Sequence, residues 1–180
     1  MGELERVGSS LALDFEGPPV LATFLVDTSL SSAEYVSRIR AVLSAAIRSA
    51  DEISTGSEFL PEGNVPDWFA EVTRGSVSVG RDDPATQGVR QYASRGGEEP
   101  FELQEWLFCF DPELRAWSWW DATQISDESV MLWVDSSGEP VFPCEELRWL
   151  AYVCGATAVE GPVLRAFSEW RQIASTRRRG

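Results

Sequence analysis

The 180-residue chain contains no histidine and no lysine. A Ser-His-Asp triad, a Cys-His pair, a histidine metal site, a Schiff base and a P-loop lysine are therefore chemically excluded. Carboxylate, thiol, hydroxyl, arginine and indole groups remain available for chemistry. Because none of them forms a diagnostic catalytic motif, we expect a protein that is not an enzyme, with no catalytic residue and no cofactor.

Acidic side chains near predicted strand and helix ends are the first candidates for acid-base chemistry. A glycosidase-like mechanism needs two carboxylates close together, one of them with its pKa raised by an apolar neighbour such as tryptophan. Nothing in the spacing requires such a pair, and among 29 acidic residues some proximity to tryptophan is expected by chance. A solvated surface is therefore favoured for Asp121, Asp135, Glu139, Glu145 and Glu146.

Metal and thiol chemistry have weaker support. The segment from Asp135 to Glu139 is superficially similar to a calcium loop, but it lacks the alternating acidic ligands, so we predict a turn and no metal site. Cys144 follows Pro143 at a predicted helix start, where a thiolate would be stabilised, but Glu145 and Glu146 oppose that stabilisation. We interpret all three cysteines as reduced structural thiols: Cys109, Cys144 and Cys154.

The formal net charge of -14 favours encounter with basic partners and repels nucleic acid and anionic membranes. The first residues lack the basic start and apolar core of a signal peptide, and the longest apolar runs are too short to span a bilayer. We therefore expect a soluble, cytoplasmic protein with a basic protein partner and with neither nucleic-acid nor membrane binding.

The first half of the chain predicts strands followed by helices. β-rich segments at Leu11–Phe15 and Val20–Val26 flank a turn, which favours a hairpin or two neighbouring strands. Ser31 and Glu34 form a capping box before a helix with one apolar face. A short helix is predicted from Pro66 to Gly75.

The next segment, 76–100, is rich in glycine and acidic residues, and we predict a flexible loop there, with Val89–Ala93 as an alternative strand. The remaining segments alternate between strands and helices. They are predicted strands at Leu103–Phe110, Arg115–Asp121 and Ser129–Asp135, turns at 111–114 and 122–128, a helix between Pro143 and Gly155, and a closing helix at Pro162–Ala174.

These elements predict one α+β domain over residues 1–174, with a largely antiparallel sheet and helices packed on one face. Residues 175–180 are predicted to form a disordered, arginine-rich tail.

Five of the eight tryptophans lie on the three predicted strands of the second half. Strand alternation places Trp106, Phe108, Phe110, Ser118 and Trp120 on one face, and Leu107, Cys109, Trp117, Trp119 and Asp121 on the other. On the third strand, Val130, Leu132 and Val134 face the core, and Met131, Trp133 and Asp135 lie opposite. Both faces are apolar, so the face without helices needs a partner, a ligand or a second covering layer.

The predicted partner- or ligand-binding surface consists of Trp117, Trp119, Asp121, Met131, Trp133 and Asp135. Rigid aromatic side chains would anchor a basic protein and carboxylates would engage its charges, a balance similar in composition to that of small inhibitors and immunity proteins. Three alternatives remain open. The same surface would suit a carboxylate-dependent hydrolase or a carbohydrate-binding domain. The tryptophans would also suit a small-ligand pocket between the sheet and the helices. In the third alternative, both faces are internal and the tryptophans fill a two-layered core.

Overall fold

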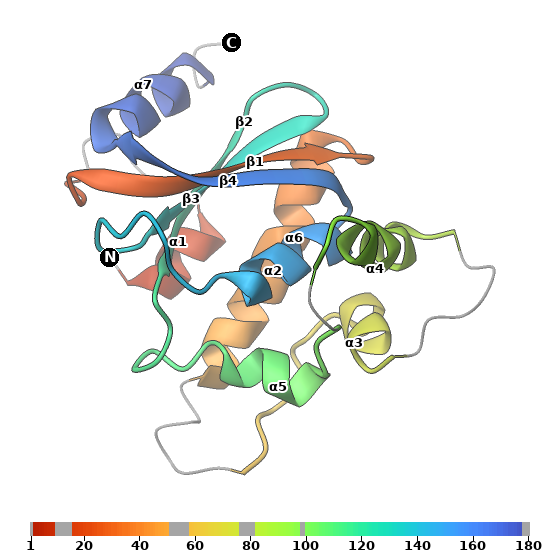
Figure 1. Cartoon of the computed structure of the whole chain (residues 1–180). Helices are drawn as coiled ribbons and strands as arrows, with labels where there is room; N and C mark the ends of the chain where they lie inside the picture. Colours follow the sequence, from red (N-terminus) through yellow and green to blue (C-terminus); the bar gives the residue numbers. More distant parts are fainter. Residues whose placement is uncertain (1, 10–15, 51–57, 76–81, 98–99, 178–180) are drawn as a thin grey trace.

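A four-stranded antiparallel sheet, with strand order β2-β3-β1-β4, forms the centre of the protein (Figure 1). The computed structural model describes residues 2–9, 16–50, 58–75, 82–97 and 100–177. Its strands are β1 (Val20–Thr28), β2 (Ser118–Gln124), β3 (Ser129–Asp135) and β4 (Ala156–Ala166). Its helices are α1 (Glu3–Gly8), α2 (Ser32–Ala50), α3 (Asp67–Thr73), α4 (Pro84–Ser94), α5 (Leu103–Phe108), α6 (Glu145–Val153) and α7 (Phe167–Arg177). The predicted α+β fold with a largely antiparallel sheet is confirmed.

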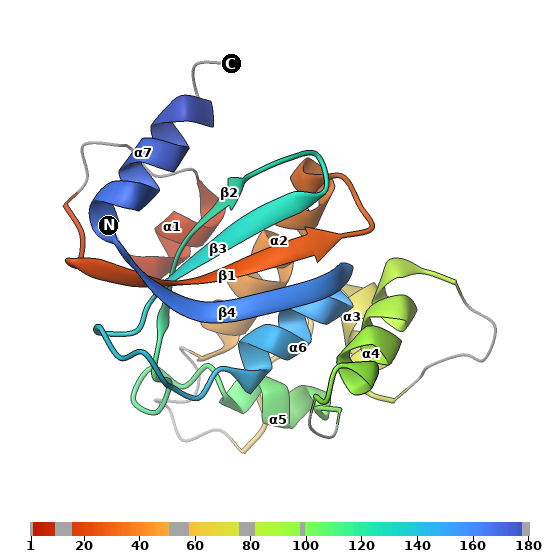
Figure 2. The same ribbon diagram turned by 45° about the horizontal axis from the view of Figure 1, so that its top comes forward.

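Most of the helices lie on the inner side of the sheet, where α2 and α6 pack against it and α5 packs on α2 farther from the strands (Figures 1 and 2). β1 runs through the middle, and its burial pattern shows that Leu25 and Asp27 are exposed whereas the residues before Leu25 are buried or half-buried. Its Phe24 and Val26 enter the large inner core, where they meet residues of α2 and α6 such as Ile39, Leu43 and Leu150. Burying this many apolar side chains is the main source of stability for the fold.

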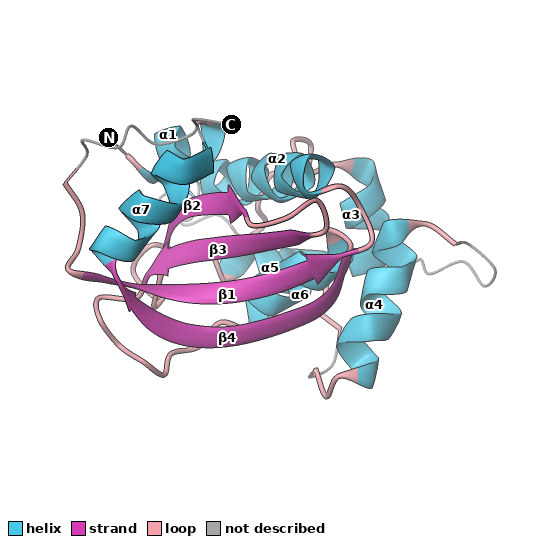
Figure 3. Ribbon diagram, turned by 90° about the horizontal axis from the view of Figure 1, so that it is seen from above, coloured by secondary structure: helices cyan, strands magenta, loops and turns pink. Residues whose placement is uncertain are grey.

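The outer face carries one helix, α7, which lies over one end of the sheet (Figure 3). The outer cluster is the set of buried residues between α7 and the sheet: Leu21, Trp120, Met131, Trp133, Phe167, Trp170 and Ala174. Phe167 and Trp170 stack with ring centroids 5.1 Å apart, and Trp120 meets both edge-on. The helix therefore closes part of a face that would otherwise expose indole rings.

Several predicted elements are confirmed where local signals were strong. α2 begins at the predicted cap, where the Glu34 amide donates to Ser31 Oγ at 3.3 Å. α3 follows Pro66, and Gly75 adopts a left-handed φ of 75° just beyond it. β3 has its predicted bounds.

The segment predicted as a loop or strand contains a helix, α4. Asp83 caps it, because its Oδ1 accepts hydrogen bonds from the amides of Ala85 and Thr86 at 3.1 Å each, and Pro84 occupies the first turn. The strand alternative at Val89–Ala93 is therefore wrong. Residues 76–81 and 98–99 lie outside the described residues, as does the predicted strand at Leu11–Phe15.

The strand predicted at Leu103–Phe110 is also wrong, because this segment forms α5. Its buried residues Leu103, Trp106 and Leu107 have helical spacing, and Phe110 extends the same stripe. β2 begins at Ser118 and runs into the segment predicted as a turn, to Gln124.

The closing segment divides into a strand and a helix. Pro162–Ala166 belongs to the edge strand β4, where a proline without an amide donor is tolerated beside a register shift in the pairing with β1. The helix α7 then extends to Arg177, so 175–177 continue it rather than forming a tail. Among the described helices, none is long and apolar enough to cross a membrane.

Candidate functional site

The predicted aromatic surface is divided between the two faces of the sheet. In the β2–β3 register, Trp119 pairs with Val134 and Asp121 pairs with Trp133, so Trp120 is an extra residue between them. Such a bulge shifts the side-chain alternation by one position. Trp119 therefore enters the inner core, Trp120 enters the outer cluster, and Asp121 lies beside Trp133.

The six predicted site residues do not form an exposed face. Met131 and Trp133 belong to the outer cluster, whereas Trp117 and Trp119 belong to the inner core. Their exposed fractions are 3% for Trp117, 0% for Trp119, 4% for Asp121, 8% for Met131 and 0% for Trp133. Asp135 is half-buried, and it accepts a hydrogen bond from the Ser137 amide at 2.8 Å within its turn. The prediction that these residues share one accessible surface is wrong.

Asp121 connects the helices on opposite faces of the sheet. One carboxylate oxygen accepts from Trp170 Nε1 of α7 at 3.0 Å, and the other accepts from Arg40 of α2 at 3.2 Å. A buried carboxylate held by a cation and an indole donor has its hydrogen-bonding capacity used inside the fold. This residue positions α7 rather than offering a charge to a partner.

Glu146 is a second buried carboxylate, and it lies at the start of α6. Trp117 Nε1 donates to its Oε1 at 2.5 Å, and Trp106 Nε1 donates to its main-chain oxygen at 3.0 Å. Burial raises the pKa of Glu146, although the Trp117 hydrogen bond and the Arg115 charge act in the opposite direction. Glu146 thus connects α6 to two indoles, Trp106 of α5 and Trp117 just before β2.

The raised pKa of Glu146 predicts a specific pH dependence. The folded state disfavours its charged form, so stability rises as pH falls from the folded pKa towards the unfolded value. Glu146→Gln keeps an acceptor for Trp117 and removes the titration. We expect the free energy of unfolding of Glu146→Gln, relative to that of the parent, to be highest at neutral pH. This difference should shrink on acidification. Urea unfolding at a series of pH values measures this difference in free energy. If the free energies of the two proteins change in parallel with pH, the pKa of Glu146 is not raised in the folded state.

The three cysteine thiols lie in surroundings that disfavour their charged form. Burial raises the pKa of Cys109 to about 11 and also raises the pKa values of Cys144 and Cys154. A thiol with a raised pKa is a poor nucleophile near neutral pH. Over the same residues, no group of three or more carboxylate or thiol side chains is placed to hold a metal ion.

One half of the outer sheet face is left uncovered by α7 (Figure 3). On this half, Leu25 of β1 pairs with Glu160 of β4, and Val163 pairs with Thr23. Leu25 is 36% exposed and Val163 is 53% exposed, so both large apolar side chains are accessible on this half of the sheet. Asp27 and Glu160 are exposed on the same face. We call Leu25, Asp27, Glu160 and Val163 the open face.

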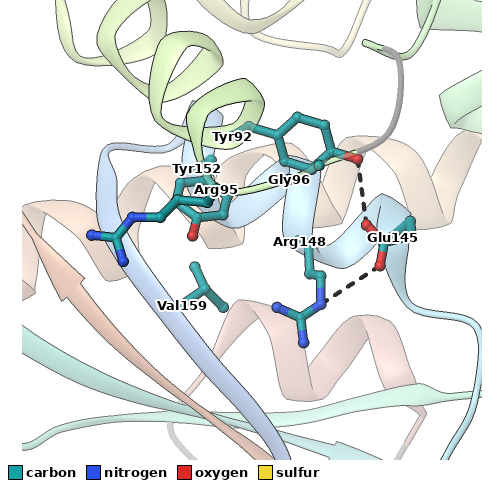
Figure 4. Close-up of a pocket in the computed structure, with 8 residues that line it drawn as sticks. Tyr92, Arg95, Gly96, Glu145, Arg148, Tyr152 and Val159 are labelled. Atoms are coloured by element: carbon teal, nitrogen blue, oxygen red, sulfur yellow. Dashed lines mark hydrogen bonds and ion pairs between the residues drawn. The ribbon is translucent and has the colours of Figure 1, made fainter.

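A pocket of about 400 Å³ lies on the inner side of β4, between that strand and helices α4 and α6 (Figure 4). Tyr92 and Arg95 reach it from α4 and its C-terminal end, Arg148 and Tyr152 from α6, and Val159 from β4. Its remaining lining residues are Gly96, Gly97 and Glu145. Sequence reasoning missed this site because α4 was not expected.

The open face and the pocket are therefore the candidate binding surfaces of the described chain. Comparison with known proteins finds no matching family model, no matching curated protein and no matching solved structure.

Proposed function

We propose that this chain is a non-enzymatic interaction protein that binds a basic protein through the open face. The observation that carries the proposal is the pairing of exposed apolar side chains with exposed carboxylates on an uncovered sheet surface. Leu25 and Val163 supply apolar contact, and Asp27 and Glu160 flank them. Apolar contact surrounded by charge is the usual arrangement of a protein-binding surface.

The acidic charge next to the open face extends into a neighbouring turn. Asp127 and Glu128 are exposed in the turn between β2 and β3. The Thr28 amide donates to the Glu128 main-chain oxygen at 2.9 Å, which holds this turn beside the end of β1 that carries Asp27. A basic partner would therefore meet several carboxylates along one end of the sheet, and their field would accelerate its association.

Many arginines are engaged inside the molecule, which leaves the acidic charge facing solvent. Arg38 lies 3.7 Å from the centre of the Trp68 ring and donates to the Cys154 main-chain oxygen at 3.0 Å. Arg40 binds Asp121, and Arg115 binds Glu3 while lying over aromatic rings. Together with the net charge of -14, these contacts support a basic rather than an acidic partner.

The face of the sheet is more available than its edge. β4 is the edge strand next to β1, and an open edge would invite pairing with another chain. Arg95 donates to the Thr157 main-chain oxygen at 3.3 Å, and Arg148 donates to that of Gly161. Because these arginines occupy carbonyl groups along β4, we place the partner on the open face.

Capture from a lysate of the source organism, followed by measurement of affinity for the recovered protein, tests the proposal. We expect the parent to recover a basic protein. Asp27→Asn with Glu160→Gln should weaken its binding about tenfold and reduce the salt dependence, since charges at the border of an interface act mainly through the field. In the parent, Ser129 Oγ donates to Asp27 at 2.8 Å, and the amide oxygen introduced by Asp27→Asn keeps an acceptor for this hydroxyl.

Matched controls come from loops outside the open face. Glu113→Gln with Glu139→Gln removes the same charge from exposed positions. Val163→Ser removes apolar contact from the open face and should also weaken binding, and Val141→Ser, at a position that is 87% exposed, is its control. Loss of affinity in the open-face variants alone supports the proposal. Equal binding by all variants, or recovery of no basic protein, refutes it.

The Trp-rich surface gives no support to the hydrolase or carbohydrate alternatives. Sugar stacking needs an accessible indole face, and the five tryptophans expected on strands are all buried. None of these tryptophans lines the pocket, so their burial does not bear on ligand binding there.

A further inference from the structure

The pocket between α4, α6 and β4 is a second candidate site, independent of the open face. Val159 lines the pocket and packs against the inner core, whereas its neighbour Glu160 belongs to the open face. Successive residues of a strand point to opposite faces, so the two sites lie on opposite sides of β4. A ligand in the pocket would not occupy the surface proposed for the protein partner.

The pocket has a local excess of positive charge in a strongly acidic chain. Two arginines, Arg95 and Arg148, line it together with one carboxylate, Glu145. Figure 4 shows that the two arginines come from different elements, Arg95 from the end of α4 and Arg148 from α6, and that their guanidinium groups point in different directions. The net charge of -14 makes most of the surface unfavourable for anions. An anionic ligand would therefore bind preferentially at this pocket, where positive charge is in excess.

Both arginines are held in place by contacts that leave them at the pocket wall. Arg148 donates to the Gly161 main-chain oxygen, its Nε lies 3.7 Å from Glu145 Oε1, and its guanidinium lies 5.6 Å from the centre of the Phe24 ring. Arg95 is anchored by the Thr157 main-chain oxygen at 3.3 Å. Such anchoring lowers the entropy lost when a ligand binds.

The remaining wall is closely packed and partly aromatic. Tyr92 donates to Glu145 Oε2 at 3.4 Å, and its ring packs edge-on against Trp149 with centroids 5.1 Å apart. A Cβ added at Gly97 would lie 2.5 Å from the Tyr92 ring, so the main chain runs directly over it. Tyr152 and Val159 complete a surface on which the organic part of a ligand can rest.

We propose that this pocket binds a small organic molecule through a phosphate or carboxylate group. Arg95 and Arg148 supply the positive charge of the pocket, and a guanidinium group matches the geometry of both anions. A volume of about 400 Å³ lies within the range of small-molecule sites and exceeds what an inorganic ion needs. The tyrosines and Val159 then contact the rest of the molecule.

Amide chemical shifts test the site with defined probes. Potassium phosphate and potassium acetate are each titrated into the 15N-labelled full chain, at ionic strength matched with potassium chloride. We expect saturable shifts at the amides of Gly96, Gly97 and Tyr152. Saturation by phosphate alone identifies a phosphate ligand, and saturation by acetate alone identifies a carboxylate ligand.

Variants assign any binding to the pocket. Arg95 is exposed, so Arg95→Gln should keep the fold, and we expect it to weaken probe binding about tenfold, the effect of losing a charged hydrogen-bond donor. Arg90→Gln makes the same charge change at an exposed position of α4 outside the pocket and should bind like the parent. Shifts that stay linear with both probes, or equal weakening by Arg95→Gln and Arg90→Gln, overturn the proposal. The open-face variants should leave probe binding unchanged, so failure here is distinguishable from failure of the protein-binding proposal.

Discussion

Trp133→Ala is expected to lower the free energy of unfolding by about 3 to 5 kcal/mol, the cost of removing a large buried aromatic side chain. Trp133 is fully buried in the outer cluster, and its Nε1 donates to Thr123 Oγ1. Alanine would leave a cavity between the sheet and α7 and an unused hydroxyl on β2. Urea denaturation, followed by circular dichroism, measures the loss.

Leu25→Ala is the matched control for this prediction, because Leu25 lies on the same face of the sheet but is 36% exposed. We expect it to cost about 1 kcal/mol. A Trp133→Ala variant as stable as the parent would mean that the indole is not enclosed, and the Trp-rich surface would again be the candidate for partner binding.

Gly88→Ala is expected to destabilise the protein by about 3 kcal/mol through overpacking between α4 and α6. A Cβ at this position would lie 1.8 Å from the Tyr152 main-chain oxygen and 2.5 Å from its carbonyl carbon. These contacts are with backbone, so α4 has to move away as a unit. The displacement would also separate Tyr92 and Arg95 from Arg148 and Tyr152, and probe binding in the pocket should weaken.

Gly8→Ala is the control, since it lies at the end of α1 with nothing within 4 Å of an added Cβ. It should be neutral or slightly stabilising. Thermal unfolding of the two variants gives the comparison. Equal melting temperatures would show that α4 does not pack closely on α6 and would weaken the case for a rigid pocket.

Elements with strong local signals were predictable from the sequence. The Ser31 cap and the apolar stripe determine α2, and the alternation of Val130, Leu132 and Val134 against Met131 and Trp133 determines β3. Two segments predicted as loop and strand carry helix signals in the sequence. Asp83 and Pro84 are a standard helix start before α4, and the residues of α5 have helical spacing.

Other features depend on tertiary packing. The bulge at Trp120 places Asp121 on the same face as this indole, beside Trp133, and no local propensity in a run of tryptophans indicates where an extra residue enters a strand. The segment around Pro162 and Val163 becomes a strand because it pairs with β1, although its apolar spacing also fits a helix. The pocket follows from the docking of α4 on α6, which requires Gly88 and is not encoded in the periodicity of either helix.

Seven of the tryptophans are internal, and we propose that a partner binds the open face instead. Acrylamide quenching of tryptophan fluorescence tests this burial most directly, because seven of the eight tryptophans are buried and Trp68 is half-buried. In a Trp68→Phe variant, we predict blue-shifted emission with little quenching until the protein unfolds. Red-shifted emission and efficient quenching in the folded variant would contradict the burial of the indoles, because indoles at the surface would then be available to a partner.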